Sequence, residues 1–345
     1  MPLTPEEDAK LQPRVTVNGF DNAAVQAACN QAKQQNAVVF LPAGTYQFSG
    51  VVTVPAGLKL LGAGSGTVIQ ATSESVAGLF ALGGDKIRIT RMKILGANMH
   101  WNRTNNTTGI MASGRQDTRI DHDELAGFKY AINVGGAAAI QIDHCSIHHN
   151  LVDGLGYGVL PDQGTYALII DSEFSQCRHM LASNGAGRRP TNWQFRHNHV
   201  QHNDEAQVQE GALDIHPGMV DGTSVTADNV FEDLTYGLEI DDGSGWIAHN
   251  VFRRFSGWAI AIRQRTQHGT LPQGSMPHDY YVDQNTFEAV KQPLNLGTAK
   301  NITQDGQMLS STQDANYPRV TKILWLNEMG DDQHLTWTEV PLPPP

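Results

Sequence analysis

The chain has 345 residues and a formal net charge of −11, a length that allows one elongated β domain. The acidic balance argues against nucleic acid as the main partner, and it disfavours capture of an acidic polymer unless basic residues cluster locally. Three cysteines cannot form a closed disulfide framework, and the lack of a paired Cys-x-x-Cys motif argues against a structural zinc site.

The first predicted element is a helix over residues 20–36. Asp21 or Asn22 can serve as its N-cap, and small apolar residues follow at helical spacing. Short strands interrupted by Pro-Ala-Gly turns are predicted over residues 37–64.

From about residue 85 the sequence repeats a short pattern. An apolar residue is followed three positions later by a polar or small residue, and five positions later by another apolar residue. The copies begin at Ile89, Ile120, Ile142, Ile169, Phe195, Thr226, Ile247 and Val282. The shortest steps between copies are 21 and 22 residues, about one coil of a parallel β-helix, and the excess is loop. Stacked coils would bury continuous apolar columns that no single coil can bury alone.

Two polar columns of the repeat are predicted to be scaffold. The middle position is Asn in four copies, which suits an asparagine ladder at a turn, because Asn tolerates left-handed backbone and stacked amides bond to one another. These residues are Asn198, Asn229, Asn250 and Asn285. A neighbouring column contains His122, His144, His197 and His249, with Asp171 and Asp228 in the coils between. We interpret the histidines as a structural ladder and not as a metal site, since none has tight metal-ligand spacing.

Three short segments in the second half of the chain alternate apolar with other residues, which is typical of strands with one buried face. If these strands stack in parallel about 4.8 Å apart, Asp214 lies beside Glu239. In the next column, His216, Asp241 and Arg263 become neighbours. Such groups on one exposed strand face have no packing rationale, and like charges on adjacent rungs push one pKa upward, as acid/base chemistry requires. We interpret the column as a catalytic site; the alternative is a solvated face with ordinary salt bridges.

A basic cluster is predicted beside these carboxylates. Arg178 and His179 open one strand, and Arg188 and Arg189 follow in the adjoining loop. In an acidic protein these groups indicate capture of a substrate carboxylate or sulfate, whereas the alternative is a loop made soluble by charge. Tyr157, one coil earlier, is either a proton donor or an aromatic residue half buried at a coil edge.

Long insertions would wall a groove if they project on the same side as the carboxylates. They fall at residues 96–108, 184–192, 202–211 and 264–279. We assign Trp101 and Asn184 to substrate binding. Trp101 offers an aromatic ring that can stack on a sugar, and Asn184 shares the outward column of His216.

The predicted helix followed by the segment VVFLPAGTY, together with the repeats, resembles right-handed parallel β-helix proteins of the pectate-lyase-like superfamily. The acidic pair that usually precedes this helix is replaced here by Phe20-Asp21-Asn22. The resemblance implies an all-β fold, a single-stranded right-handed parallel β-helix with an N-terminal capping helix that covers edge strands. We expect one domain over residues 1–345, made of a cap (1–50), coils (51–297) and a C-terminal strand and tail (298–345).

That superfamily includes polysaccharide lyases, glycoside hydrolases such as polygalacturonases, C5-epimerases and phage tailspike depolymerases. The triplet Asp214-Ile215-His216 is similar to the Asp-Pro-His element of alginate epimerases. Asp241-Asp242 with Arg263 one coil later is faintly similar to the polygalacturonase pattern, whose Asn-Thr-Asp, Gly-His-Gly and Arg-Ile-Lys elements are not matched here.

The resemblance and the column together predict an enzyme that cleaves a uronate-containing polysaccharide by β-elimination. Arginines of the basic cluster or the column would neutralise the uronate carboxylate. His216 or His179 would be the base, oriented by Asp214 or Asp241, and Tyr157 or a histidine would protonate the leaving oxygen. The alternatives are a glycoside hydrolase that uses the paired carboxylates of the column, a C5-epimerase, and a non-catalytic tailspike-like carbohydrate-binding module.

The expected partner is a polysaccharide or oligosaccharide, with neither nucleic acid nor a membrane involved. No apolar run is long enough to span a bilayer, and the chain shows no signal peptide. A secreted or periplasmic location is nevertheless expected from the resemblance. No metal or cofactor is indicated, and a calcium requirement and the choice between monomer and homo-oligomer stay open.

Overall fold

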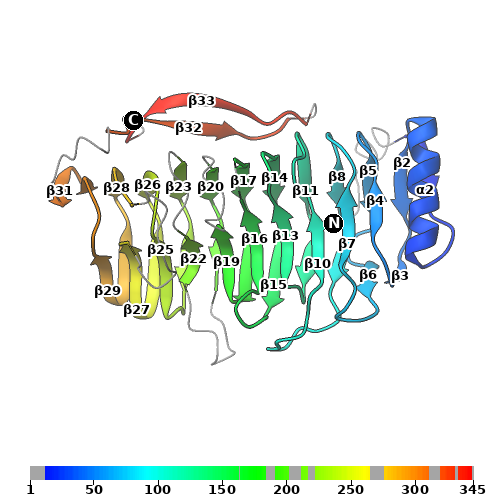
Figure 1. The fold of residues 1–345 in the computed structure, drawn as a ribbon, viewed down its shortest axis with the longest axis horizontal. Coiled ribbons are helices and arrows are strands. Elements are labelled where there is room, and N and C mark those ends of the chain that lie inside the picture. Colours follow the sequence, from blue (N-terminus) through cyan, green and yellow to red (C-terminus); the bar gives the residue numbers. More distant parts are fainter. Residues whose placement is uncertain are drawn as a thin grey trace.

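The computed structural model describes residues 12–162, 164–183, 191–201, 211–216, 222–264, 276–310, 319–330 and 333–343. The chain folds as a right-handed parallel β-helix whose coils stack along one axis, with helix α2 at one end (Figure 1). Within the described residues, no helix has the length and apolar character needed to cross a membrane.

One face of the β-helix, here called sheet 1, is parallel except for its last strand. It consists of β1 (Arg14–Thr16), β2 (Val38–Leu41), β5 (Lys59–Gly62), β8 (Arg88–Thr90), β11 (Thr118–Asp121), β14 (Ala139–Asp143), β17 (Tyr166–Ile170), β20 (Asn192–Arg196), β23 (Thr223–Ala227), β26 (Ser244–Ala248), β28 (Tyr280–Asp283), β30 (Ile302–Gln304) and β31 (Gln307–Ser310). Because β30 pairs in parallel with β28, the coils continue past residue 297, the boundary expected from the sequence.

The other two faces are joined by two long strands that bend across both of them, β27 (Val251–Ile262) and β29 (Thr286–Leu296). Sheet 2 consists of β3 (Gly44–Phe48), β6 (Thr67–Ala71), β9 (Lys93–Leu95), β12 (Glu124–Ala126), β15 (Ser146–Asn150), β18 (Glu173–Cys177), β21 (His199–Val200) and β24 (Val230–Glu232). Sheet 3 consists of β4 (Val52–Val54), β7 (Gly78–Leu82), β10 (Thr108–Met111), β13 (Tyr130–Val134), β16 (Tyr157–Pro161), β19 (His179–Ser183), β22 (Gly211–Ile215) and β25 (Tyr236–Ile240).

The apolar columns predicted from the repeat are confirmed by the strand register. In sheet 1 the successive partners are Ile89, Ile120, Ile142, Ile169, Phe195, Thr226, Ile247 and Val282. In sheet 2 they are Ile94, Leu125, Ile147, Phe174, Val200, Phe231, Phe252 and Phe287. Nearly all are fully buried, and burying each such side chain contributes about 1.5–3 kcal/mol. The columns therefore form one continuous core.

Helix α2 (Asn22–Gln35) covers the end of this core. Asp21 is its N-cap, as predicted, because its side chain accepts a hydrogen bond from the backbone N–H of Ala24 at 2.8 Å. The helix ends at Asn36, which has left-handed backbone with φ of 50°. Its buried residues are Val25, Ala28, Cys29 and Ala32.

The asparagine ladder at the turn from sheet 1 to sheet 2 is also confirmed. The side-chain oxygen of Asn229 accepts the backbone N–H of Asn198 at 2.8 Å, and its Nδ2 donates to the carbonyl oxygen of Phe195 at 2.8 Å. The left-handed backbone expected at these asparagines instead belongs to the histidine and aspartate column, where each residue directly precedes a ladder residue. There φ ranges from 49° to 59° at His122, His144, Asp171, His197, Asp228 and His249.

The ladder predicts a stability effect at Asn229. Asn229→Ala should lower the free energy of unfolding by about 2–4 kcal/mol, because it leaves the buried backbone N–H of Asn198 and the carbonyl of Phe195 without these bonds. Chemical denaturation measures the change. The matched control is Asn106→Ala on an exposed loop, which should change stability by less than about 0.5 kcal/mol. Equal unfolding midpoints for the two variants would contradict the prediction.

The C-terminal segment forms an antiparallel hairpin, β32 (Lys322–Asn327) and β33 (Thr336–Pro341), where the sequence predicted a single strand. The hairpin lies along the outside of sheet 1 (Figure 1), where Gln194 donates to the carbonyl of Leu324 at 2.8 Å. Arg196 places its guanidinium 4.4 Å from the ring centre of Trp325. The outward apolar residues that it covers are Ala139, Leu168, Ile170, Val225, Ala227, Trp246 and Ala248. Sheet 1 is therefore buried on both faces in these coils.

Candidate active site

The predicted carboxylate column lies on the outer surface of sheet 3. Asp214 on β22 pairs in register with Glu239 on β25, as the alternation of the sequence predicts. Their chain neighbours Leu213 and Leu238 point into the core and are almost completely buried. Because side chains alternate along a strand, the two carboxyl groups project from the opposite surface on adjacent rungs.

The next outward column continues this register beyond the strand ends. The backbone N–H of Asp241 donates to the carbonyl of Ile215 at 3.0 Å, and that of Arg263 donates to the carbonyl of Ile240 at 3.0 Å. These bonds place His216, Asp241 and Arg263 on successive coils. The predicted juxtaposition of the five polar residues is therefore present in the structure.

The expectation that this face is solvent-exposed is wrong for the carboxylates. Asp214 is 3% exposed, Glu239 is 8% exposed and Asp241 is fully buried, whereas the side chains of His216 and Arg263 remain about a quarter exposed. One contribution is close packing between rungs, since a Cβ atom added at Gly211 would lie 2.9 Å from Cγ of Glu239.

Asp214 lies between two imidazoles. Nε2 of His216 donates to Oδ2 of Asp214 at 2.7 Å, and Nε2 of the fully buried His179 lies 3.4 Å from the same oxygen. Nδ1 of His179 is 2.5 Å from the carbonyl oxygen of Gly211, which can only accept, so Nδ1 carries a hydrogen. The carboxyl group of Asp214 is thus within reach of both imidazoles.

Glu239 faces a cation that is itself held by aromatic rings. Nη2 of Arg263 lies 3.5 Å from Oε1 of Glu239. The guanidinium carbon of Arg263 lies 4.7 Å from the ring centre of Trp258, and Trp258 stacks on Tyr236 with ring centres 4.0 Å apart. A cation over an aromatic face is attracted to the ring quadrupole. This packing fixes the position of the positive charge next to Glu239.

Arg178 and Tyr157 lie on the other side of His179. Nη1 of Arg178 donates to the hydroxyl of Tyr157 at 3.2 Å, and the rings of Tyr157 and His179 have centres 5.3 Å apart. Tyr157 is 7% exposed, and its hydroxyl donates to the carbonyl of Gly154 at 3.3 Å. These contacts correspond to the alternative interpretation of Tyr157, an aromatic residue packed at the edge of a coil. The remaining predicted binding residues Asn184, Arg188 and Arg189 lie outside the described residues.

Trp101 belongs to the loop between β9 and β10 and is half-buried. Neighbouring Asn102 pins this loop to a later coil, since its backbone N–H donates to the carbonyl of Leu151 at 3.0 Å, and Arg103 forms an ion pair with Asp153 at 2.7 Å. The segment at 151–153 precedes β16, two strands before β22 in sheet 3. Trp101 therefore lies beside sheet 3 but apart from the carboxylates.

Residues 16–263 match the family model described as rhamnogalacturonase A/epimerase, pectate lyase-like. The chain belongs to this family. No curated protein matches the chain. This is a carbohydrate-active β-helix family. The prediction of a carbohydrate-active β-helix protein is therefore confirmed, whereas the prediction of a lyase is not.

Solved structures agree with this family at the level of the fold. The catalytic unit of an α-1,3-glucanase from Streptomyces thermodiastaticus is similar with a TM-score of 0.56 and 13% identity, over 86% of this chain and 57% of that chain. A variant of the tailspike protein of E. coli bacteriophage HK620, solved with a pentasaccharide, gives a TM-score of 0.57 and 12% identity, over 86% and 62%. The tailspike protein 2 of bacteriophage CBA120 gives 0.53 and 12%, over 81% and 44%. The chain thus spans less than two thirds of these proteins' own length.

Three further residues of this pectate-lyase-like chain contribute to the site without being predicted. Tyr236 and Trp258 each stand two residues before an inward apolar residue, the same place that Tyr157 occupies on its coil. That recurrence was the available signal for an aromatic column. Asp242 is buried, and its Oδ1 accepts backbone N–H groups of Gly243 at 2.8 Å and Met276 at 3.0 Å, which holds the end of β25 in place. Nothing in its sequence position distinguishes it from the adjacent Asp241.

Across the described part of the chain, no three His, Cys, Asp or Glu side chains converge in a way that could hold a metal ion. What the arrangement offers is acid/base chemistry from carboxyl groups and imidazoles, with one guanidinium beside them.

Proposed function

We propose that the chain is a glycoside hydrolase that cleaves a polysaccharide or oligosaccharide with the carboxyl groups of sheet 3. The observation that carries this proposal is the register that pairs Asp214 with Glu239 on adjacent rungs. Adjacent strands lie about 4.8 Å apart, close to the carboxyl separation of about 5–5.5 Å in retaining enzymes. Asp214 with Asp241 would be the wider pair, which suits the inverting reaction.

The two carboxyl groups have surroundings that suit different roles. Arg263 supplies a positive charge 3.5 Å from Glu239, which suits Glu239 to act as the charged nucleophile. Asp214 faces the imidazoles of His216 and His179, which can supply and recover a proton as the leaving group departs and water attacks. In this assignment Asp214 is the general acid and then the general base.

The test is incubation with neutral and acidic polysaccharides, with reducing ends and ultraviolet absorbance read in the same samples. Hydrolysis releases reducing ends without the absorbance of an unsaturated sugar. Proton NMR of the first product then gives the anomeric configuration, and retention is expected for Asp214 with Glu239. Inversion would instead assign Asp241, in place of Glu239, as the second catalytic carboxyl group. If no sugar is released from any polymer, the non-catalytic carbohydrate-binding module is favoured.

A lyase that acts by β-elimination on a uronate-containing polysaccharide is the second candidate. The observation that favours it is the partly exposed His216, whose Nε2 lies 2.7 Å from Oδ2 of Asp214. Asp241 lies on the next coil and Arg263 on the coil after that. An imidazole base and a guanidinium for the uronate carboxylate are the groups that this reaction or a C5-epimerisation needs. Lysine cannot serve as the base from these coils, since none occurs between Lys129 and Lys291.

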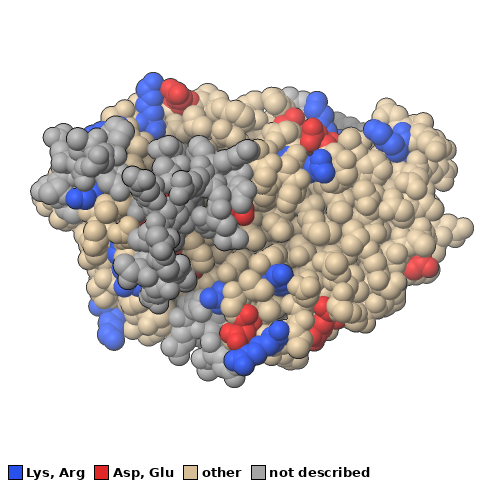
Figure 2. All heavy atoms as spheres, viewed as in Figure 1, with Lys and Arg blue, Asp and Glu red and all other residues tan. Residues whose placement is uncertain are grey.

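The net charge favours the hydrolase over the lyase. Figure 2 shows Lys, Arg, Asp and Glu of the described residues scattered over the visible face. With a net charge of −11, the protein offers no general attraction for an acidic polymer. A secreted or periplasmic location is part of the proposal, because a polymeric saccharide meets an enzyme outside the cytoplasm.

A further inference from the structure

A second constellation lies away from sheet 3, on the turn from sheet 1 to sheet 2. Arg91, His122 and His144 follow β8, β11 and β14, and all three have left-handed backbone, with φ of 64°, 57° and 53°. Because β8, β11 and β14 pair in register, the three residues stand on successive coils. The rings of His122 and His144 are stacked, with centres 4.9 Å apart and planes 2° apart. A guanidinium and two imidazoles therefore form one column along the turn.

A second short column faces the first across a groove of about 300 Å³. It lies at the start of sheet 2, where Lys93 pairs in register with Glu124 and Glu124 with Ser146. The ammonium of Lys93 is 2.6 Å from a carboxylate oxygen of Glu124. Met92 and Asp123, both almost completely buried, line the floor between the two columns.

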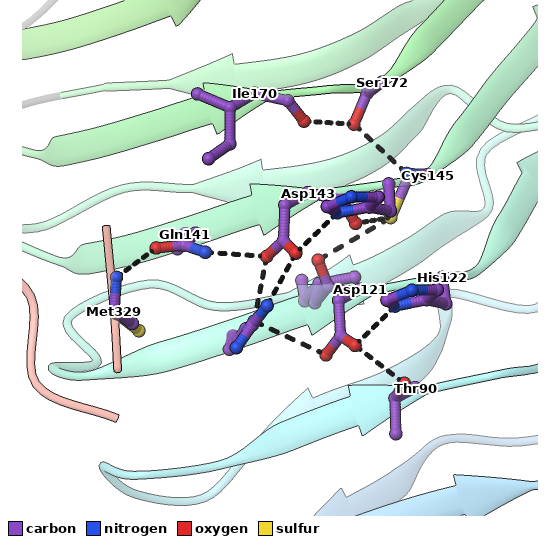
Figure 3. A network of polar contacts seen from close by, with 12 residues as sticks. Thr90, Asp121, His122, Gln141, Asp143, Cys145, Ile170, Ser172 and Met329 are labelled. Carbon is purple, nitrogen blue, oxygen red and sulfur yellow. Dashed lines mark hydrogen bonds and ion pairs between the residues drawn. The ribbon is translucent and has the colours of Figure 1, made fainter. Parts of the chain in front are cut away.

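Both imidazoles are held in the same tautomer by buried carboxylates (Figure 3). Nδ1 of His122 lies 2.8 Å from Asp121, and Nδ1 of His144 lies 3.0 Å from Asp143. An ionised carboxylate can only accept, so Nδ1 carries the hydrogen of the neutral ring and Nε2 is where a further proton binds. Parallel rings anchored at the same atom present their Nε2 atoms side by side, without converging on one point. Such donors suit the separate oxygens of one oxyanion.

The two carboxylates are neutralised by arginines of sheet 1. Arg88 forms two hydrogen bonds of 2.7 Å with Asp121, and Arg119 forms bonds of 2.9 and 2.7 Å with Asp143. Burial acts to raise the pKa of Asp121, but hydrogen bonds outweigh it and hold that pKa well below its usual value. The imidazole side chains above them remain 41% and 52% exposed. A proton taken up by either ring therefore adds positive charge to the groove.

The groove has a positive charge balance within an acidic protein. The cations that line it or stand behind the imidazoles are Arg88, Arg91, Lys93 and Arg119. The carboxylates that they face are those of Asp121, Glu124 and Asp143. Four positive charges against three negative ones leave +1 with neutral imidazoles and +3 when both are protonated. Asp123 on the floor adds little negative charge, because burial raises its pKa well above the usual value.

The surrounding residues limit this positive region to three coils. One coil beyond His144 and Ser146, both columns become acidic, at Asp171 and Glu173. On the outer side of sheet 2, Nε2 of His148 lies 3.6 Å from the carboxylate of Glu124, and burial lowers the pKa of this histidine. The positive charge is therefore concentrated at the end of the groove that Arg91, Lys93 and His122 line.

We propose that this groove binds a tetrahedral oxyanion, a sulfate or phosphate group, either free or carried as an ester on a saccharide. Arg91 and Lys93 supply permanent positive charge, and the protonated Nε2 atoms of His122 and His144 donate hydrogen bonds. Charge-assisted bonds from guanidinium and ammonium groups are a common means of recognising such anions. An ammonium group has three donors, so Lys93 can contact the anion while it remains paired with Glu124. The site does not depend on the function proposed for sheet 3.

Binding should take up protons, because a neutral ring directs the lone pair of Nε2 towards the anion. Histidine side chains ordinarily titrate near pH 6.5, so sulfate should bind about tenfold more tightly at pH 5.5 than at pH 7.5. Sulfate is the probe because its own charge does not change between these pH values. A sulfate affinity that is the same at both pH values would overturn the assignment of the imidazoles to the site.

The experiment is isothermal titration of the full chain with Na₂SO₄ at constant ionic strength. The variants are Arg91→Asn and His122→Asn, because asparagine tolerates left-handed backbone. The matched controls are Lys86→Asn and His249→Asn, which make equivalent changes at left-handed positions outside the groove. At pH 5.5, each of the first two variants should weaken sulfate binding about tenfold, and the controls should bind as the wild type does. Thermal unfolding in sulfate-free buffer checks that all variants are folded.

The pH dependence separates the two kinds of donor. Arg91→Asn should retain the change in affinity between pH 5.5 and pH 7.5, whereas His122→Asn should reduce it. A wild type without saturable sulfate binding overturns the proposal. Equal loss of affinity in Arg91→Asn and Lys86→Asn also overturns it, because it would reveal attraction to net charge alone.

Parallel titrations with galactose 6-sulfate and galactose distinguish the two sources of the anion. Tighter binding of galactose 6-sulfate than of sulfate supports the site and assigns it to a sulfated saccharide. Equal or weaker binding of the ester supports a site for the free oxyanion. Galactose should not bind, and galactose binding that Arg91→Asn abolishes would contradict recognition of an anion.

Discussion

Replacing Asp214 with Asn should lower the rate of saccharide cleavage by about 10²–10⁴-fold, the usual contribution of a positioned acid or base. The amide keeps the size of the side chain and can still contact His216, but it can neither lose nor regain the proton that the leaving group needs. Glu239→Gln should have an effect at least as large, because it removes the nucleophile. The measurement is the turnover number on the polymer that the screen identifies.

A matched control separates this effect from damage to the fold. Glu173→Gln makes the same chemical change at an exposed position on sheet 2 and should leave turnover unchanged. The Michaelis constant of the Asp214 variant should change little if its role is in the chemical step. Full activity in Asp214→Asn would remove the assignment of the carboxylate column.

Replacing Asp123 with Asn should raise the free energy of unfolding at pH 7 by up to about 4 kcal/mol. Asp123 is the buried member of the ladder column on the coil of β11, where its Oδ1 accepts the backbone N–H of Met92 at 2.9 Å. Its Oδ2 is buried and has no hydrogen-bond partner among the described residues. At the same position of a later coil, Nδ2 of Asn198 donates to the carbonyl of Ile169 at 3.0 Å. An amide at position 123 can donate in this way without taking up a proton.

The raised pKa of Asp123 determines how the free energy of unfolding changes with pH. Burial, together with the nearby charge of Asp121, raises the pKa of Asp123 well above its usual value. Between about pH 3.9, the pKa in the unfolded chain, and the raised pKa in the folded state, the folded protein keeps a proton that the unfolded chain has released. The wild type therefore loses stability as pH rises from about 4, by about 1.4 kcal/mol per unit until the folded pKa is reached.

Denaturation curves of the wild type and Asp123→Asn between pH 4 and pH 8 measure this effect. The two proteins should differ least near pH 4 and most near neutral pH. Asn250→Asp is the matched reverse change in the same column, and it should lose stability with rising pH. A difference between wild type and Asp123→Asn that does not vary with pH would contradict a protonated Asp123.

Much of the fold could be predicted because, in a β-helix, the position of a residue within the sequence repeat determines its position on the coil. The alternation around Leu213 and Leu238 and the spacing of the repeats together specify which residues meet, so the pairing of Asp214 with Glu239 was available before any coordinates. The asparagine ladder was predictable for the same reason. Each of these inferences needs only the period of the strand and the length of a coil.

The remaining features depend on contacts that the sequence repeat does not specify. The hairpin meets sheet 1 across 130 residues of sequence, through bonds such as Gln194 to Leu324. A signal for it existed in β17, where Ala167, Leu168, Ile169 and Ile170 are all buried and a strand with one solvated face would alternate. The burial of Asp214 and Asp241 had no such signal, since the sequence reveals the direction of a side chain but not what packs beside it.

The coil, the inward columns and the order of residues along each outer face follow from local periodicity repeated at nearly constant length, so they could be predicted from the amino-acid sequence. Three outcomes depend on packing in three dimensions: which outward groups are covered, which imidazole contacts which carboxylate, and that Trp258 holds Arg263 beside Glu239. Those outcomes arise from close packing between coils and from the returning hairpin, where distances of a few tenths of an ångström separate a bond from no bond.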